Sequence, residues 1–222
     1  MKLISSVFGM AAVKVPGDSV APLEGAVIKD VIEAIGRKYE FATKPPLQLA
    51  AQGQLAVFQG GALKADDRRI GIIQLALLAN GDIAMAQTTE QADLIVSDLI
   101  NFLEETFGFR YKSAEKERLH MSNVVVQFEK EAGQAFDRFA AMENLLNDGK
   151  EPRFQFKRLG FGQGDITAAN ALSVESLQNA DFAIERRAGE PYSSNRFFCS
   201  APMQTREHLA ILEKFEGLLL AA

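Results

Sequence analysis

The chain has little of the chemistry that usually marks a catalytic or metal site. Its 222 residues include one cysteine, two histidines and no tryptophan. A single cysteine, Cys199, excludes an intrachain disulfide and a four-thiolate metal centre. Neither His120 nor His208 has a second metal-ligating residue at the spacing of i+2 to i+4. We therefore expect no bound metal and no cofactor.

Long hydrophobic runs are also missing, because no segment approaches the roughly 18–20 apolar residues that cross a bilayer. The stretch Leu3–Val13 could be a weak signal peptide or a first β-strand. Ser5, Ser6 and Gly9 interrupt its apolar run, and this favours the strand. The lack of disulfides fits a reducing compartment, and the predicted location is cytoplasmic.

Positive charge is in deficit. The 24 basic residues are outnumbered by 29 acidic residues, for a net charge of −5 and an isoelectric point near 5.2. This balance disfavours non-specific binding to DNA, RNA or an anionic membrane. Hydrophobic residues make up 47% of the chain and charged residues 24%, which is typical of a globular protein and not of a disordered one.

The first half shows alternating strand and helix patterns. Spacing and turn residues predict strands at Leu3–Phe8, Leu47–Ala51, Gln54–Ala62 and Arg69–Leu78, and a helix at Leu23–Tyr39. Asn80-Gly81 predicts a hairpin with a type I′ turn. Thr88 and Gln91 have the spacing of a capping box, which begins a helix that Gly108 should end.

The second half repeats these patterns after a charged connector at Phe109–His120. The predicted elements are a strand at Val124–Phe128, a helix at Gln134–Asn147, a strand at Arg153–Phe161, a helical turn at Ser173–Leu177, a hairpin of Phe182–Arg186 with Arg196–Ser200, and a helix at Thr205–Leu220.

The order of elements predicts an internal repeat, with residues 1–109 and 110–222 as two α+β units that could pack as one domain. The predicted fold is a mostly antiparallel curved sheet of two pseudo-repeated β-α-β(3–4)-α halves, with helices on one face. Two unrelated halves are the alternative. In element order alone, the arrangement resembles the duplicated TATA-binding-protein arrangement, and no function follows from that.

Basic and aromatic residues gather on predicted strands of the second half. If alternate residues share an open sheet face, they form a surface for a phosphate backbone, a single strand or an acidic peptide. The alternative is an ordinary solvated face, balanced by neighbouring acids. The candidate binding residues are Arg153, Gln155, Lys157, Arg158, Arg186 and Arg196.

Two other features bear on function. The loop Gly160–Gly164 lacks the parallel βαβ setting of a dinucleotide fingerprint. The last helix is apolar over most of its circumference, so it should contact the other half or a second copy of the chain.

We therefore expect a non-enzymatic binding or scaffold protein that holds a macromolecular partner through a curved sheet face or helix surface. The expected partner is another protein, or a second copy of the chain through the last helix. The alternative is a small-molecule-binding protein or enzyme with its site between the halves and Gly160–Gly164 as a lid. A weak nucleic-acid binder is the third hypothesis. No catalytic residue is predicted.

Overall fold

The structure is a computed structural model that describes residues 1–16, 20–22, 25, 27–42, 54–65, 68–129, 158–162, 173–191 and 194–220. The predicted strand at Leu47–Ala51 and the predicted helix at Gln134–Asn147 lie outside these residues. Of the predicted strand Arg153–Phe161, only the last four residues are described.

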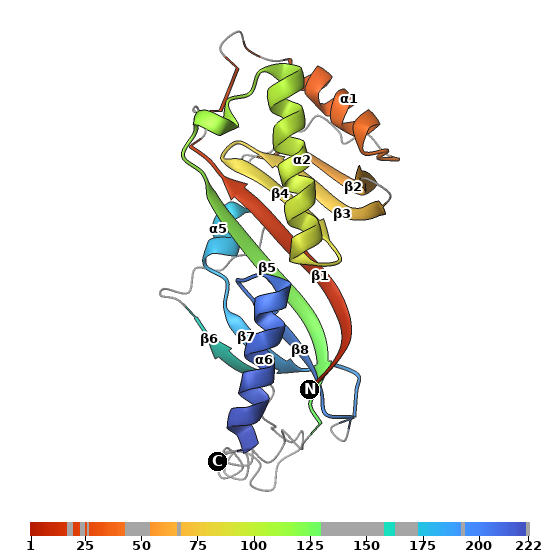
Figure 1. Cartoon of the computed structure of the whole chain (residues 1–222), viewed down its shortest axis with the longest axis vertical. Helices are drawn as coiled ribbons and strands as arrows, with labels where there is room; N and C mark the ends of the chain where they lie inside the picture. The colour runs from red at the N-terminus through yellow and green to blue at the C-terminus, as the bar shows by residue number, and fades with distance from the viewer. Residues whose placement is uncertain are drawn as a thin grey trace, which may run out of the picture.

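The fold is α+β, as predicted, and its described residues form one antiparallel sheet of eight strands (Figure 1). The strands are β1 (Lys2–Lys14), β2 (Gln54–Ala65), β3 (Arg68–Leu78), β4 (Gly81–Ala86), β5 (Glu117–Gln127), β6 (Arg158–Phe161), β7 (Phe182–Arg186) and β8 (Arg196–Ala201). They lie in the order β2-β3-β4-β1-β5-β8-β7-β6. The helices are α1 (Ile28–Lys38), α2 (Thr89–Phe107), the 3₁₀ turn η1 (Tyr111–Ser113), α5 (Val174–Gln178) and α6 (Thr205–Leu220).

A long two-stranded ribbon of β1 and β5 forms the middle of the sheet. β4 pairs with β1 only over Gly9–Lys14, and β8 pairs with β5 only over Ser122–Gln127. The two outer groups of strands are therefore attached to opposite ends of the ribbon, which gives the molecule its elongated shape (Figure 1).

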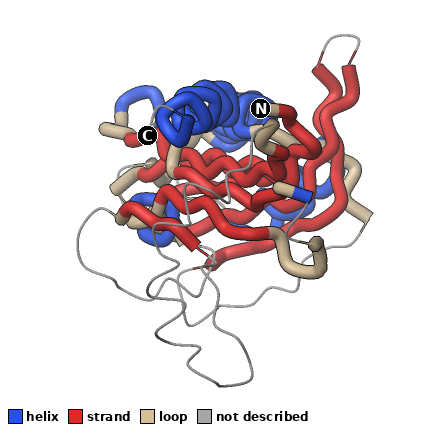
Figure 2. The backbone as a smooth tube through the Cα atoms, turned by 90° about the horizontal axis from the view of Figure 1, so that it is seen from below, coloured by secondary structure: helices blue, strands red, loops and turns tan. Residues whose placement is uncertain are grey.

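The long helices cover one face of this sheet (Figure 2). Helices α1 and α2 pack on one side of β1 with Ala11 and Val13, and α6 packs on the same face of β5 through Leu212. The short α5 lies on the opposite face, where Val174 and Leu177 contact Ala12 and its neighbours. The expectation that all helices cover one face is thus wrong for α5. Its Val174 and Leu177 cover a cluster that includes Ala12, whose side chain faces away from α2.

The local signals around α2 are confirmed. The Thr88 hydroxyl accepts a hydrogen bond from the Gln91 N–H at 3.3 Å, and Gly108 ends the helix with φ of 69°. The hydroxyl satisfies one of the free N–H groups of the first turn, and glycine adopts the left-handed conformation at low cost.

The β3–β4 hairpin is confirmed, but its predicted type I′ turn is wrong. The two turn residues are Ala79 and Asn80, while Gly81 is the first residue of β4. Gly81 has φ of 149°, and a Cβ there would lie 2.1 Å from the Val13 carbonyl oxygen. Glycine at this position is required by the close approach of β1, so it does not serve as the second residue of the turn.

The segment predicted as a charged connector contains the start of a strand, because β5 begins at Glu117. Its charged residues interrupt the apolar alternation that predicts a strand. Two of them have partners on α2. Arg118 and His120 both reach Asp93, at 3.3 Å and 2.7 Å. Charged residues can therefore occupy alternate positions of a strand, on its helix-covered face, when the helix supplies the opposite charge.

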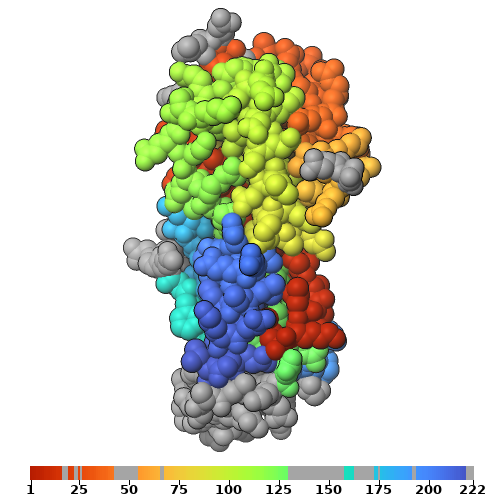
Figure 3. Space-filling view, in the orientation of Figure 1, coloured from red at the N-terminus to blue at the C-terminus, as the bar shows by residue number. Residues whose placement is uncertain are grey.

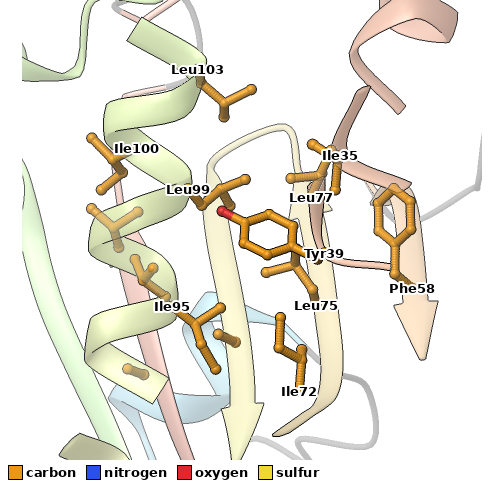
Figure 4. Close-up of a cluster of buried hydrophobic side chains, with 14 of the residues drawn as sticks. Ile35, Tyr39, Phe58, Ile72, Leu75, Leu77, Ile95, Leu99, Ile100 and Leu103 are labelled. Atoms are coloured by element: carbon orange, nitrogen blue, oxygen red, sulfur yellow. The ribbon is translucent and has the colours of Figure 1, made fainter. Parts of the chain in front are cut away.

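The largest buried cluster lies between α1, α2 and strands β2 to β4 (Figure 4). Tyr39 is fully buried there, with its ring beside Leu99 and Leu75, and its hydroxyl donates to Asp98 at 2.7 Å. A second cluster lies under α6, and a third lies under α5.

Helices α2 and α6 meet at their N-termini, where each supplies hydrogen bonds to the other (Figure 3). The Thr89 N–H donates to the Thr205 hydroxyl at 3.1 Å, and the Thr205 N–H donates to the Thr89 hydroxyl at 2.6 Å. The Arg206 N–H donates to the Glu90 carboxylate at 3.0 Å. Free N–H groups of two helix starts are thus satisfied across the middle of the molecule.

Replacing Gly9 with alanine should destabilise the protein by about 2 kcal/mol, because an added methyl would overlap this helix junction. A Cβ on Gly9 would lie 2.1 Å from the Thr89 backbone nitrogen. The matched control is Gly36→Ala inside α1, where a Cβ meets nothing within 4 Å and alanine favours the helix. Urea unfolding measures both, and equal effects would contradict the close packing.

Candidate functional site

A cavity of about 160 Å³ lies at the end of the β3–β4 hairpin, on the face that α1 and α2 cover. Its walls come from the α1 and α2 helices, from β2, β3 and β4, from the chain that follows β1, and from the chain around η1. The residues that line it are Val15, Val20, Ala21, Ile28, Val31, Leu55, Leu77, Leu78, Ala79, Gly81, Asp82, Leu103, Phe109 and Tyr111.

Asp82 is the one carboxylate in this lining, and the strand register explains why it is buried. It pairs with Val13 on one side and Leu77 on the other, and both of these residues belong to the core under α1 and α2. A side chain at this position must therefore face the core, and only 3% of Asp82 is exposed.

Tyr111 gives this carboxyl its hydrogen bond. Its hydroxyl donates to Asp82 Oδ2 at 2.6 Å, and its ring stacks beside Phe109 with centroids 6.0 Å apart. The turn η1 positions this side chain directly after α2, so the predicted boundary at residue 110 falls just before a tyrosine that is buried in the first core.

Burial controls the protonation of this site. Removal from water raises the pKa of Asp82 to about 7, although the Tyr111 hydroxyl acts in the opposite direction. Burial and the nearby Asp82 charge also raise the pKa of Tyr111, so the tyrosine stays a hydrogen-bond donor. The pair can therefore present either a neutral acid or a carboxylate to the cavity near neutral pH.

Only part of the predicted basic site can be placed. Arg153, Gln155 and Lys157 lie outside the described residues. Arg158 and Arg196 form ion pairs with nearby acids, at 3.5 Å to Asp181 and 3.1 Å to Glu190.

The described arginines do not share one sheet face. Arg186 pairs with Phe197 in the sheet, and its guanidinium lies 5.3 Å from the centre of that ring on the α6 side. Arg196 directly precedes Phe197 on β8 and so faces the other way. A basic surface remains a prediction for Arg158 and Arg196, and Arg186 lies on the opposite side.

The histidines and the cysteine lie apart from the cavity lining. His208 is fully buried at the start of α6, where Nδ1 lies 3.1 Å from the Ser122 hydroxyl. Burial raises the pKa of Cys199 to about 12, so its thiol is protonated and unreactive at neutral pH. Among the described residues, no three His, Cys, Asp or Glu side chains gather as a metal site.

Sequence reasoning missed Asp82 and Tyr111, although one signal was present. Asp82 alternates with Ala84 and Ala86 along an otherwise apolar strand, which places a carboxyl on the buried face. No comparable pattern marks Tyr111, because η1 is short and its surroundings are charged.

None of the described helices combines the length and the apolar character needed to cross a membrane. No protein-family model matches the chain. No curated protein sequence matches it either, so the geometry of the cavity carries the functional argument.

Proposed function

We propose that the protein binds a small, mainly apolar ligand in the cavity beside Asp82, without catalysing a reaction. This revises the place expected for a small-molecule site, because the residues that line the cavity run from Val15 to Tyr111 and only Tyr111 lies beyond the predicted boundary between the halves. The observation that carries the proposal is a carboxyl with 3% exposure in a lining that is otherwise almost wholly apolar. Such a combination of apolar walls and one or two polar groups is typical of ligand sites.

The cavity volume indicates the size of the ligand. An apolar cavity of about 150 Å³ in an unrelated protein binds benzene. The cavity here is similar, at about 160 Å³, and it reaches Ile28 at the start of α1, which is 37% exposed. A ring of six or seven atoms fits this volume.

Filling the cavity should abolish binding. Val31 is buried on α1 and lines the cavity, so Val31→Phe would place a phenyl ring in the ligand space. We expect the affinity for cyclohexanol, measured by isothermal titration calorimetry, to fall at least tenfold. Val7→Phe is the matched control, because Val7 is 42% exposed on β1 and lies outside the lining.

Two results would contradict the cavity proposal. One is the absence of cyclohexanol binding to the wild-type protein up to its solubility limit. The other is equal affinity in the wild type and in Val31→Phe, provided that circular dichroism shows the variant to be folded.

We further propose that the two halves are copies of one unit. The strand order supports this, because β4, β3 and β2 follow β1 outward just as β8, β7 and β6 follow β5. The reciprocal bonds between Thr89 and Thr205 are also what a twofold relation would produce. An experimental structure in which the two halves do not superpose would contradict it.

A second candidate function is the predicted scaffold role, with a second copy of the chain as the partner. Helix α6 buries Leu212 and partly buries Leu209 and Phe215 against the sheet, yet Leu218 is 70% exposed. We propose that this leucine, which lies beyond the packed stripe, contacts the same helix of a second copy.

If α6 forms this contact, Leu218→Lys should shift the protein from dimer to monomer. Sedimentation equilibrium at several concentrations measures the change. Glu213→Gln, an exposed position on another side of α6, controls for the altered charge. A wild-type protein that is monomeric at high concentration would contradict the homodimer.

A further inference from the structure

The Asp82 carboxyl has one oxygen engaged and one available. Oδ2 accepts the Tyr111 hydroxyl at 2.6 Å. Asp82 makes no other side-chain hydrogen bond with the residues that the structure describes, and the carboxyl lines the cavity. A buried acceptor without a donor is costly, so a ligand that supplies a donor gains more here than at an exposed carboxylate.

The described residues that line the cavity carry no positive charge. No lysine, arginine or histidine belongs to the described lining. The titratable groups nearest the Asp82–Tyr111 pair are Tyr39, at the end of α1, and Glu104 on α2. Glu104 pairs with Lys112 at 3.1 Å, and Lys116 donates to the backbone carbonyl of Tyr111 at 3.4 Å. The site therefore repels an anion and lacks a counter-charge of its own for a carboxylate.

We propose that the cavity binds a small alicyclic or aliphatic amine as its ammonium ion, with the Asp82 carboxylate as the ion-pair partner. This inference rests on the proposed function, since it names the ligand class of the same cavity. The ammonium donates to the free oxygen of Asp82, and the apolar walls hold the hydrocarbon part. The Tyr111 hydroxyl keeps the carboxyl oriented.

The pairing makes the affinity depend on pH in a defined direction. Without ligand, burial holds the pKa of Asp82 near 7, whereas a bound cation favours the ionised form and lowers that pKa. Binding below pH 7 then releases a proton, and affinity rises about tenfold for each pH unit until it levels above pH 7. The tyrosines do not titrate in this range, because burial raises the pKa values of Tyr39 and Tyr111.

The test compares cyclohexylamine with cyclohexanol, which has the same shape and no charge. Isothermal titration calorimetry of the full chain should show an amine affinity that rises about fiftyfold from pH 5 to pH 7. The alcohol affinity should change less than threefold. Asp82→Asn should weaken amine binding at pH 8 at least tenfold and remove its pH dependence, while the alcohol affinity should fall less than threefold. Asp30→Asn, an exposed acid on α1, should behave like the wild type.

The outcomes separate the two proposals. If cyclohexanol binds and the amine shows no advantage at pH 8, the amine inference is overturned and the cavity proposal stands. If Asp82→Asn retains the pH-dependent amine binding, the ion pair is not at Asp82 and the inference is also overturned. If neither probe binds the wild-type protein, the proposed function itself is wrong.

Discussion

Asp82→Asn is expected to stabilise the ligand-free protein at pH 8 by about 4 kcal/mol. In the unfolded chain this carboxyl loses its proton near pH 3.8, whereas the folded protein holds it until about pH 7. Between these pH values the folded state binds more protons, so stability falls as the pH rises. The amide of asparagine keeps the shape and the bond to Tyr111 but never becomes charged.

Urea unfolding at intervals between pH 4 and pH 8 measures this effect. The wild-type free energy of unfolding should decline across the interval relative to that of Asp82→Asn, and the two curves should approach each other at pH 4. Asp30→Asn serves as a control, because the Asp30 side chain is exposed. Parallel curves for the wild type and Asp82→Asn would show that Asp82 ionises freely in the folded state.

Acid should destabilise the protein through His208, by about 3 kcal/mol between pH 6.5 and pH 4. Burial lowers the pKa of His208 to about 4, and its Nε2 has no hydrogen-bond partner among the described residues. The unfolded chain takes up this proton near pH 6.5 and the folded chain only near pH 4. The unfolded state therefore binds more protons in this interval, and stability falls as the pH falls.

The chain has only two histidines, so the origin of this acid sensitivity can be tested directly. His208→Gln keeps a donor for the Ser122 hydroxyl and should remove most of the loss between pH 6.5 and pH 4. His120→Gln should retain it, because His120 is partly exposed and lies 2.7 Å from Asp93. If His120→Gln, and not His208→Gln, removes the loss of stability, the burial of His208 is not its cause. The ionisation of Asp82 makes the protein more stable as the pH falls, which is opposite to the effect of His208. The two histidine variants are therefore compared in a protein that also carries Asp82→Asn.

Signals that act within a few residues were sufficient to predict much of the fold. Thr88 and Gln91 define the start of α2, and Gly108 defines its end, because each effect depends on backbone groups one turn away. Ser173 shows the same local control, since its hydroxyl accepts from the Ser176 N–H at 3.1 Å at the start of α5. The strands of the hairpins at residues 68–86 and 182–201 were also predicted.

Effects that depend on distant residues were not predicted from the sequence. The start of β5 was missed because the counter-charge for Arg118 and His120 lies on another element, at Asp93. The turn at Asn80 was misassigned because Gly81 is required by the approach of β1.

The sequence by itself determined that this is an α+β protein with an antiparallel sheet, because alternation and helix caps are local properties of the chain. Only the tertiary structure decided which faces are covered and which polar groups are buried. Asp82 shows the reason: its protonation depends on the exclusion of water by α1, α2 and η1, and on a hydroxyl 29 residues away. Burial is a collective property of packed elements, so no stretch of sequence encodes it alone.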